Sequence, residues 1–336
     1  MYIAEDINQL KQLFVTKLKG MLSDDEMGAF ILVMANSHQD EFLKSELDAD
    51  LKNTFSVLKS KFSTGKIKAA ADDVAVFERL LEVDLDDVPV WQYNNIGDWE
   101  IALNPIRQLR PARAASQILS SIKQPYDENK FHFNKPFLKP EILWEGKYKG
   151  VNSRVLYNKF PFSEYHLLIV ISPENNSSQL LTQDSHQYVF SLVEEMEEKF
   201  PGFGIGYNSL AAGASVNHFH FQGFIREQDF SIEKEQWHHN SGEFEYPLAV
   251  KSFSDAGSSW QYLDQLTMHD QAFNCLYRKG RCYVVPRKFQ GAVELPEWLN
   301  GAGWIDVAGA ITVSDETTFN TIDEQSVANA LVLLKQ

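Results

Sequence analysis

Apolar residues recur at helical spacing through about the first eighty positions of the chain. In the opening segment they stand three or four positions apart, which is the pattern of one amphipathic helix face. This face carries Ile7, Leu10, Leu13, Phe14, Leu18 and Leu22. The same spacing returns between Leu43 and Leu58. The segment has no clustered histidines, cysteines or carboxylates of the kind that mark a site, so we expect residues 1–85 to be a helical N-terminal region that serves packing rather than chemistry.

An acidic, proline-ended segment at residues 84–89 is the predicted boundary, and the pattern changes beyond it. Short runs that alternate polar and apolar residues replace the helical spacing, as is typical of strands. The clearest run spans residues 217–222. Since successive side chains of a strand point to opposite faces, this run predicts a polar face and an aromatic face. The polar face carries His218, His220 and Gln222, and the aromatic face, expected in the core, carries Phe219, Phe221 and Phe224.

The remaining elements predict an α+β fold. Residues 153–157 and 166–171 have the composition of two antiparallel strands, and 177–200 that of a helix which Pro201-Gly202 ends. A similar series then returns in weaker form. It comprises a strand at 246–250, a helix at 258–270, a hairpin at 272–286 around Lys279-Gly280 and a terminal helix at 322–336. We therefore predict a duplicated domain over residues 86–336, with a catalytic half at about 100–230 and a degenerate half at about 231–336 that lacks a second two-histidine strand.

A small-residue loop precedes the two histidines. It begins at Asn208, contains Gly213 and ends at Ser215. Small residues let backbone approach a ligand closely, and backbone amides can then hold an anion. The Asn208 amide and the Ser215 hydroxyl add side-chain donors for phosphate oxygens.

The His-x-His-x-Gln pattern suits nucleophilic attack on phosphorus. A neutral imidazole can attack if its other ring nitrogen is held by a hydrogen bond. His220, the second histidine, lies deeper in the run and is the candidate nucleophile, whereas His218 would orient the site or hold a phosphate oxygen. Gln222 can donate a hydrogen bond but not a proton, which suits a leaving group that departs as a phosphate ester anion.

The residues alone leave two other interpretations of the histidine pair. It can be part of a metal site, or simply the polar face of a sheet. The metal interpretation is disfavoured because no third ligand at suitable spacing accompanies the pair. A second pair, His238-His239, stands in a polar, glutamate-rich segment and is expected to be solvated.

Three arginines stand within seven residues in an otherwise acidic chain, at Arg107, Arg110 and Arg113. Guanidinium groups bind phosphate well. Isolated surface arginines are usually solvated, so both a phosphate-binding and a solvated role stay open at this point.

Composition and net charge limit the classes of molecule that the chain is expected to bind. The chain has 336 residues, is 44% hydrophobic and 23% charged, and carries a formal charge of -15, so it has the make-up of a soluble globular protein. Nucleic acids and anionic membranes require a basic face, and the charge argues against both as partners. A small anionic substrate stays allowed, because a few arginines can make a local positive pocket.

Two cysteines, Cys275 and Cys282, are too few for a disulfide framework and fit a reducing compartment. The first residues lack the basic start and apolar run of a signal peptide, and no apolar stretch is long enough to span a bilayer. We therefore expect a cytoplasmic protein.

Four stretches resemble the transferase branch of the histidine-triad superfamily. They are QPYDENKFHFNK from Gln124, NKFPFSEYHLLIV from Asn158, GYNSLAAGASVNHFHFQGF from Gly206 and FNCLYRKGRCYVVPRK from Phe273. That branch includes galactose-1-phosphate uridylyltransferases, diadenosine tetraphosphate phosphorylases and GDP-hexose phosphorylases. The chain is most similar to the last group, the GDP-L-galactose and GDP-D-glucose phosphorylases. The uridylyltransferases' cysteine metal ligands are missing here, which disfavours that relative.

The resemblance implies a duplicated histidine-triad α+β architecture with antiparallel sheets and flanking helices. It implies that His220 forms a covalent nucleotidyl-histidine and that no metal or other cofactor takes part. The phosphate contacts that it implies are Asn208, Ser215, His218 and Gln222, with Asn158 near the ribose or phosphates and with Lys130 or the Arg107-Arg110 pair assisting the incoming phosphate. One departure is Glu164-Tyr165-His166, because relatives often have a glycine before the histidine.

By this resemblance we expect an enzyme that splits a GDP-hexose with inorganic phosphate into GDP and a hexose 1-phosphate, as a monomer or homodimer. An alternative is a dinucleoside polyphosphate phosphorylase, which shares the chemistry and differs in the leaving group. An alternative from another class is a nucleotide-binding regulatory protein that has kept the site without turnover.

Overall fold

The N-terminal region is helical, as predicted. In the computed structural model, which describes residues 2–24, 26–109, 119–299 and 301–336, it comprises α1 (Ile7–Met21), α2 (Met27–Ser37), α3 (Glu41–Ser63) and α4 (Ala71–Leu80). Asp6 and Asp40 begin α1 and α3 by accepting hydrogen bonds from the backbone N–H groups of Gln9 and Leu43. The inner faces of these helices share one apolar core with the main sheet, so the region and the sheet form one packed unit.

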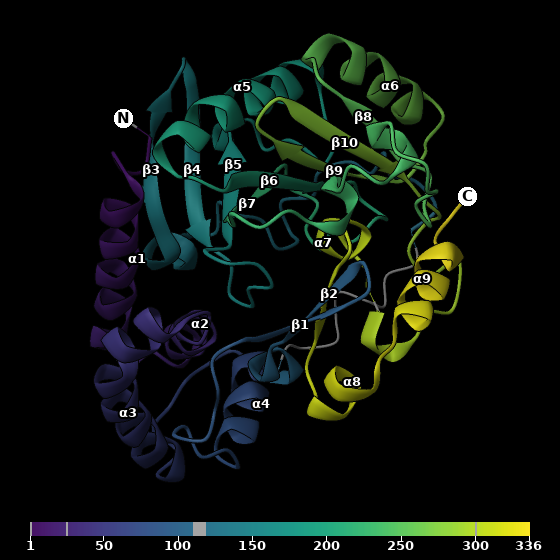
Figure 1. Cartoon of the computed structure of the whole chain (residues 1–336). Helices are drawn as coiled ribbons and strands as arrows, with labels where there is room; N and C mark the ends of the chain where they lie inside the picture. Colours follow the sequence, from purple (N-terminus) through teal and green to yellow (C-terminus); the bar gives the residue numbers. More distant parts are fainter. Residues whose placement is uncertain (1, 25, 110–118, 300) are drawn as a thin grey trace.

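The main sheet is antiparallel and has eight strands (Figure 1). In sheet order they are β3 (Ile142–Tyr148), β4 (Val151–Tyr157), β5 (Leu167–Ile171), β7 (Phe221–Ile225), β6 (Phe203–Asn208), β9 (Phe273–Arg278), β10 (Arg281–Pro286) and β8 (Lys251–Phe253). The strand pair at 151–171 and the hairpin around Lys279-Gly280 are confirmed. The predicted strand at 246–250 is wrong. The strand in this part of the chain is β8, which begins at Lys251, where backbone pairing with β10 starts.

Helices cover one face of this sheet. Figure 1 shows α5 (Gln183–Lys199) and α6 (Ala256–Met268) along the same side, where α5 packs on β6 and β9, and α6 packs on β8 and β10. Helix α5 begins later than predicted because a capping box at Thr182, completed by Ser185, sets its first turn. It ends before Pro201-Gly202, as predicted.

A second, smaller sheet lies on the other side of the main one. It comprises β1 (Gln92–Ile96), β2 (Trp99–Leu103) and β11 (Ala310–Val313), with β2 and β11 parallel. Its helices are α7 (Trp304–Val307), α8 (Glu316–Thr321) and α9 (Glu324–Leu333). The apolar residues of this unit form a second core that also holds Phe224 of β7.

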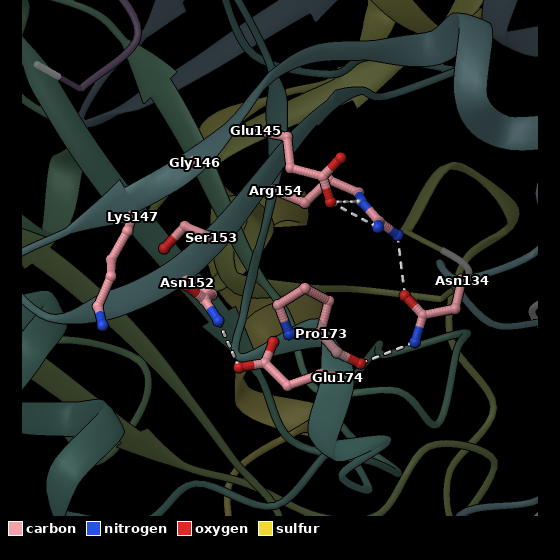
Figure 2. Close-up of a pocket in the computed structure, with 9 residues that line it drawn as sticks. All are labelled: Asn134, Glu145, Gly146, Lys147, Asn152, Ser153, Arg154, Pro173 and Glu174. Carbon is pink, nitrogen blue, oxygen red and sulfur yellow. Dashed lines mark hydrogen bonds and ion pairs between the residues drawn. The ribbon is translucent and has the colours of Figure 1, made fainter.

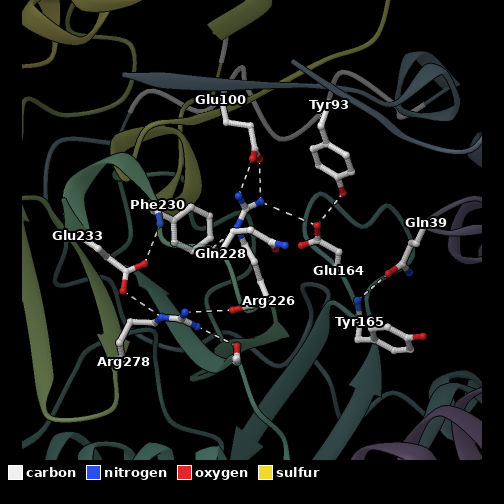
Figure 3. Close-up of polar contacts among 11 residues, drawn as sticks. Gln39, Tyr93, Glu100, Glu164, Tyr165, Arg226, Gln228, Phe230, Glu233 and Arg278 are labelled. Atoms are coloured by element: carbon white, nitrogen blue, oxygen red, sulfur yellow. Dashed lines mark hydrogen bonds and ion pairs between the residues drawn. The ribbon is translucent and has the colours of Figure 1, made fainter. Parts of the chain in front are cut away.

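A buried ionic network joins the two sheets (Figure 3). Arg226, just after β7, donates from Nη1 and Nη2 to the two carboxylate oxygens of Glu100 on β2, at 2.7 and 2.5 Å. Its guanidinium lies 3.8 Å from Glu164, which in turn accepts a hydrogen bond of 2.8 Å from the Tyr93 hydroxyl of β1. The small sheet is thereby fixed to the end of the strand that follows the histidines.

The departure at residues 164–166 has a structural account. Tyr165 adopts a left-handed φ of 48°, a conformation that favours glycine. Its N–H donates to Gln39 Oε1 at 2.6 Å and its hydroxyl to Asp40 Oδ2 at 3.2 Å. The N-terminal region therefore supplies the contacts that hold a tyrosine in this turn.

Among the described residues, no helix combines the length and the apolar character that crossing a bilayer would require.

Candidate functional site

A cavity of about 690 Å³ is lined by residues of both sheets. Seven of the predicted site residues line it: Arg107, Asn158, Asn208, Gly213, Ser215, His220 and Gln222. Two further predicted residues that the structure describes do not line it, and the remaining one is not described. His218 lies one layer behind the lining, Lys130 is exposed outside it, and Arg110 lies outside the described residues, as does Arg113.

The histidine segment differs from the predicted strand. Backbone pairing of β7 begins only at Phe221, so His218 and His220 stand on the extended segment that leads into it. Phe219 and Phe221 enter the main core, as predicted. Phe224 does not: it lies on the face of Gln222 and stacks on Trp304, with ring centroids 4.9 Å apart. Even-numbered positions share one face of the strand, which is why Phe224 joins the second core.

His220 presents one ring nitrogen to the cavity. Its Nδ1 lies 2.8 Å from the carbonyl oxygen of His218, and a carbonyl only accepts, so Nδ1 carries the proton. The Nε2 lone pair is then available, and in the described part of the chain this atom has no hydrogen-bond partner. Burial lowers the pKa of His220 to about 4. The imidazole is therefore neutral at pH 7, as a nitrogen nucleophile must be.

Gln179 holds the backbone of His220. Its Oε1 accepts from the His220 N–H at 2.9 Å, and its Nε2 donates to the carbonyls of His220 and Asn208, each at 3.0 Å. The ladder between β6 and β7 ends at Gly206 and Gln222, and this side chain bridges Asn208 and His220, which lie two positions further along in the same register. The sequence analysis did not identify Gln179 as a site residue, because it placed this residue in the first turn of a helix predicted to begin at 177.

His218 supports the site from behind. Its Nδ1 accepts from the Phe133 N–H at 3.2 Å, and its carbonyl fixes the His220 ring. Burial lowers its pKa to about 4, and the neighbouring His220 and His132 and Arg154 act in the same direction. In this position His218 orients His220 and the Phe133 loop.

The Phe133 loop is anchored by Arg154 on β4. Arg154 Nη1 donates to the Phe133 carbonyl at 2.9 Å. Figure 2 shows its other bonds: Nη1 donates to Asn134 Oδ1 at 2.8 Å, and Nε and Nη2 donate to Glu145 Oε1 at 2.9 and 2.6 Å. Asn134, Glu145 and Arg154 border a separate open hollow of about 460 Å³. The Phe133 ring then meets the edge of His220, with centroids 4.9 Å apart.

Trp304, at the start of α7, orients two of the predicted donors. Its indole Nε1 donates to Gln222 Oε1 at 2.7 Å, and its backbone N–H donates to Asn208 Oδ1 at 2.7 Å. Asn274 Nδ2 also donates to Asn208 Oδ1, at 2.6 Å. Since both amide oxygens are occupied, the NH₂ groups of Gln222 and Asn208 are left to donate into the cavity that both side chains line.

The loop at 208–215 packs closely against the segment before α7. Gly213 has φ +98°, and a Cβ there would lie 2.9 Å from both the Ala302 carbonyl oxygen and the Gly303 Cα. A glycine is therefore required by both backbone conformation and space. Ser215 is exposed at the cavity.

Cationic and amide groups complete the wall. The Arg107 guanidinium lies 4.9 Å from the centroid of Phe162. Burial raises the pKa of Asp306, and the positive charge of Arg107 opposes that rise. Asn158 Oδ1 accepts from the Phe160 N–H at 3.1 Å, and its carbonyl accepts from Asn36 of α2 at 2.9 Å. Lys159 forms an ion pair of 2.6 Å with Asp73 of α4. The N-terminal region thus holds one wall of the cavity.

Among the residues that the structure describes, no three histidine, cysteine or carboxylate side chains come together as a metal site would need. His238 and His239 lie in a short helical turn away from the cavity lining.

Comparison with known proteins confirms the resemblance and the fold. A family model described as "GDPGP1-like, N-terminal domain" matches residues 98–224. GDP-D-glucose phosphorylase 1 of Danio rerio is 35% identical over 122 residues, which are 36% of this chain and 35% of that protein. GDP-L-galactose phosphorylase 2 of Arabidopsis thaliana is 28% identical over 151 residues, 39% of this chain and 34% of that protein. The chain matches about a third of the length of these curated relatives.

Among solved structures, yeast Ap4A phosphorylase Apa2 in complex with Ap4A has a similar fold. The TM-score is 0.53 at 16% identity, and the match covers 80% of this chain and 100% of that one. The family-model match ends at Phe224 and includes the cavity residues from Arg107 to Gln222, so the sequence likeness is centred on the site.

Proposed function

We propose that this protein is a GDP-hexose phosphorylase, which splits a GDP-hexose with inorganic phosphate into GDP and a hexose 1-phosphate. The observation that carries the proposal is the state of His220: a neutral imidazole whose Nδ1 is fixed, whose Nε2 has no partner among the described residues, and which lines one cavity together with the amide side chains of Asn208 and Gln222. The curated relatives with similar sequence around this site are GDP-D-glucose and GDP-L-galactose phosphorylases.

The reaction takes two displacements at one phosphorus atom. His220 Nε2 attacks the α-phosphorus, the bond from that phosphorus to the bridging oxygen breaks, and hexose 1-phosphate leaves with the electron pair. An oxygen of inorganic phosphate then attacks the nucleotidyl-histidine, the P–N bond breaks, and GDP is released. Inversion occurs twice, so the configuration at phosphorus is retained.

The residues around His220 suit this chemistry. The leaving group is a phosphate ester, which departs as an anion and needs no proton, so Gln222 can serve as a hydrogen-bond donor without acting as an acid. The Asn208 and Gln222 NH₂ groups, oriented by Trp304, would stabilise charge on the phosphate oxygens. Arg107 would assist the incoming phosphate, with Asn158 near the ribose. Ser215 and the backbone around Gly213 would hold phosphate oxygens, and His218 acts through His220.

The proposal includes an internal duplication of the fold, an oligomeric state and a cellular compartment. The strands before residue 231 and those after it would be two histidine-triad-like units joined where β6 pairs with β9, the second without a nucleophile. The enzyme would act as a monomer or homodimer in the cytoplasm, and the two buried free thiols, Cys275 and Cys282, suit a reducing compartment.

A substrate panel tests the proposal. The full chain is incubated with GDP-glucose, GDP-mannose, GDP-L-galactose or diadenosine tetraphosphate, each with and without phosphate, and the products are separated by ion-exchange chromatography. We expect phosphate-dependent release of GDP and hexose 1-phosphate from at least one GDP-hexose. Faster cleavage of diadenosine tetraphosphate would favour a dinucleoside polyphosphate phosphorylase instead. Nucleotide binding without cleavage of any substrate would indicate a regulatory protein.

The covalent intermediate gives a second readout. With a GDP-hexose labelled at the α-phosphorus and no phosphate, the protein should become labelled in an acid-labile, alkali-stable form, as expected of a phosphoramidate. Adding phosphate should then release the label as GDP. Turnover without any labelled protein would overturn the two-step mechanism.

A further inference from the structure

The wall of the cavity has two unlike parts. One part is almost wholly apolar and comes from β4, β5 and the segment before β3. It carries Phe131, Phe133, Phe137, Leu138, Leu156 and Leu168. The other part, formed by residues 297–318, is rich in carboxylates and hydroxyls. Phe131 and Phe137 are 47% and 65% exposed, so this apolar part offers ring faces that the protein itself does not cover.

Glu141 is the one carboxylate among the described lining residues of the apolar part. It ends the short helix η4 (Pro136–Glu141), which also supplies Phe137 and Leu138. The side chain is partly buried and makes no hydrogen bond to the rest of the described chain. Burial raises the pKa of Glu141 to about 7, with Lys159 opposing and Asp73 reinforcing the shift. A carboxylate held in apolar surroundings without donors is costly unless a ligand provides them.

The nearby cation does not satisfy Glu141. The Lys159 ammonium is paired at 2.6 Å with Asp73 of α4. The other cavity carboxylates differ from Glu141: Asp306 accepts from the Gly303 N–H at 2.8 Å, Asp315 accepts from the Thr318 N–H at 2.7 Å, and Glu297 is exposed. In its ionised form, which a ligand with two N–H donors would favour, Glu141 therefore has two accepting oxygens to offer inside an aromatic pocket.

We infer that Glu141 selects guanine, by accepting hydrogen bonds from its N1–H and its 2-amino group while the ring lies against Phe137 and Leu138. A flat apolar ring with two adjacent N–H donors is the chemical group that this pocket fits, and a carboxylate accepts such a pair in a bidentate manner. Hypoxanthine lacks the 2-amino group, and adenine presents a lone pair at N1. The inference rests on the proposed function for the presence of a nucleotide substrate.

The placement agrees with the position of the nucleophile. The Phe133 ring lines the apolar part and also meets the edge of His220, with centroids 4.9 Å apart. A base held beside η4 is thus one aromatic ring away from His220, and the ribose can span the interval to the α-phosphate. Asp73 also links the N-terminal region to this part of the wall, because it pairs with Lys159, and both charges act on Glu141.

Equilibrium binding to the full chain tests the inference without net turnover: GDP, IDP and ADP carry no hexose 1-phosphate to release, and a phosphate-containing buffer returns any nucleotidyl group that His220 accepts to the free diphosphate. By calorimetry we expect the wild type to bind GDP at least about tenfold more tightly than IDP or ADP. In Glu141→Gln we expect the affinity for GDP to fall by about tenfold or more, while the affinities for IDP and ADP stay within about threefold of the wild-type values. An unchanged preference for GDP, or an equal loss for all three, would overturn the inference.

Two controls separate base selection from general damage. Glu174→Gln removes a carboxylate of the separate hollow and should leave all three affinities unchanged. Phe137→Ala removes an exposed ring and should weaken the three nucleotides alike, since stacking does not depend on hydrogen-bond pattern. If Glu141→Gln does not fold, 1-methyl-GDP, whose N1–H is blocked, makes the same test on the wild type: binding equal to that of GDP contradicts the inference.

The outcomes also separate this inference from the proposed function. Guanine selectivity that depends on Glu141, without phosphorolysis of any GDP-hexose, would refute the function and keep the inference. Phosphorolysis with base selectivity that survives Glu141→Gln would do the reverse.

Discussion

Two buried histidines with similar electrostatics occupy opposite faces of the main sheet and have different uses. Burial lowers the pKa of both His186 and His220 to about 4. His186, on α5, has both ring nitrogens bonded: Nδ1 to the Tyr277 hydroxyl and Nε2 to the Ser259 hydroxyl, each at 2.8 Å. His220 has only Nδ1 bonded, to a backbone carbonyl, and its other nitrogen faces a cavity.

The difference shows that a perturbed pKa does not by itself identify a nucleophile. Desolvation acts on both rings, because both leave water on folding. What distinguishes His220 is an unoccupied lone pair that points into a space with oriented donors. Among the described residues His38 is also buried with an unbonded Nε2, but unlike His220 it does not line the cavity. The combination of an unbonded nitrogen and a cavity, rather than burial or pKa alone, therefore singles out His220 as the candidate nucleophile.

The sharpest test exchanges each histidine for asparagine. His220→Asn should lower phosphorolysis by about 1000-fold or more, because removing a covalent nucleophile leaves only binding and electrostatic contributions. His186→Asn should keep kcat within about threefold while lowering the melting temperature, because two buried hydroxyls lose a partner. Steady-state kinetics and thermal unfolding on both variants measure this, and a comparable loss of kcat in both would erase the distinction.

The donors beside His220 should carry the next largest effect. Asn208→Ala removes an NH₂ group aimed at the phosphates, and we expect kcat to fall by about 100-fold with the nucleotidyl-histidine still formed slowly. Rapid-quench measurement of the labelled intermediate checks this. The matched control is Asn240→Ala, whose side chain donates to the Ile232 and Lys234 carbonyls away from the cavity lining and should change the rate far less. Equal losses in the two variants would mean that Asn208 acts through folding alone.

A smaller effect is expected at Trp304. Trp304→Phe keeps a ring to stack on Phe224 but removes the indole N–H that fixes Gln222. We expect kcat to fall by about tenfold, the cost of one lost orienting hydrogen bond, with little change in KM. Trp237→Phe is the control, because that indole donates to the Ser231 carbonyl in the second core and not to a site residue. A rate unchanged by Trp304→Phe would show that Gln222 needs no such support.

A further effect is on stability rather than on rate and concerns both histidines together. Each folded pKa of about 4 lies below the unfolded value of about 6.5, so the unfolded chain binds more protons between these values. The stability is complete above pH 6.5 and is lost as the pH falls toward 4, by up to about 3 kcal/mol for each ring. Urea unfolding at pH 7, 5.5 and 4.5 measures the loss, and His186→Asn should remove its own share. A stability that stayed flat across this range would contradict the lowered pKa values.

The parts of this molecule that sequence predicts are those set by local pattern. Helical spacing was sufficient for the N-terminal region, and the alternation of residues 217–222 placed His220 and Gln222 on one side. Phe224 was assigned to the wrong face: as an even-numbered residue it lies on the same face of the strand as Gln222, not on the face of Phe219 and Phe221. The strand at 246–250 was wrong because apolar content alone does not say where backbone pairing begins.

The residues that sequence missed act through tertiary contacts. Gln179 and Trp304 reach the site from segments far along the chain, and neither stands in a motif. Glu141 matters because it enters an apolar wall, which only the packing of η4 on β4 and β5 reveals. Identity and spacing can name a nucleophile, but the groups that orient it depend on the folded arrangement.

The bridge made by Gln179 has a consequence for how the site moves. It stands where the ladder between β6 and β7 would have continued, so a side chain rather than strand pairing fastens His220. Local opening requires only the bonds of the opening segment to break. If the segment that carries Gln179 opened, the backbone of His220 would therefore lose this support while every strand of the sheet stayed paired.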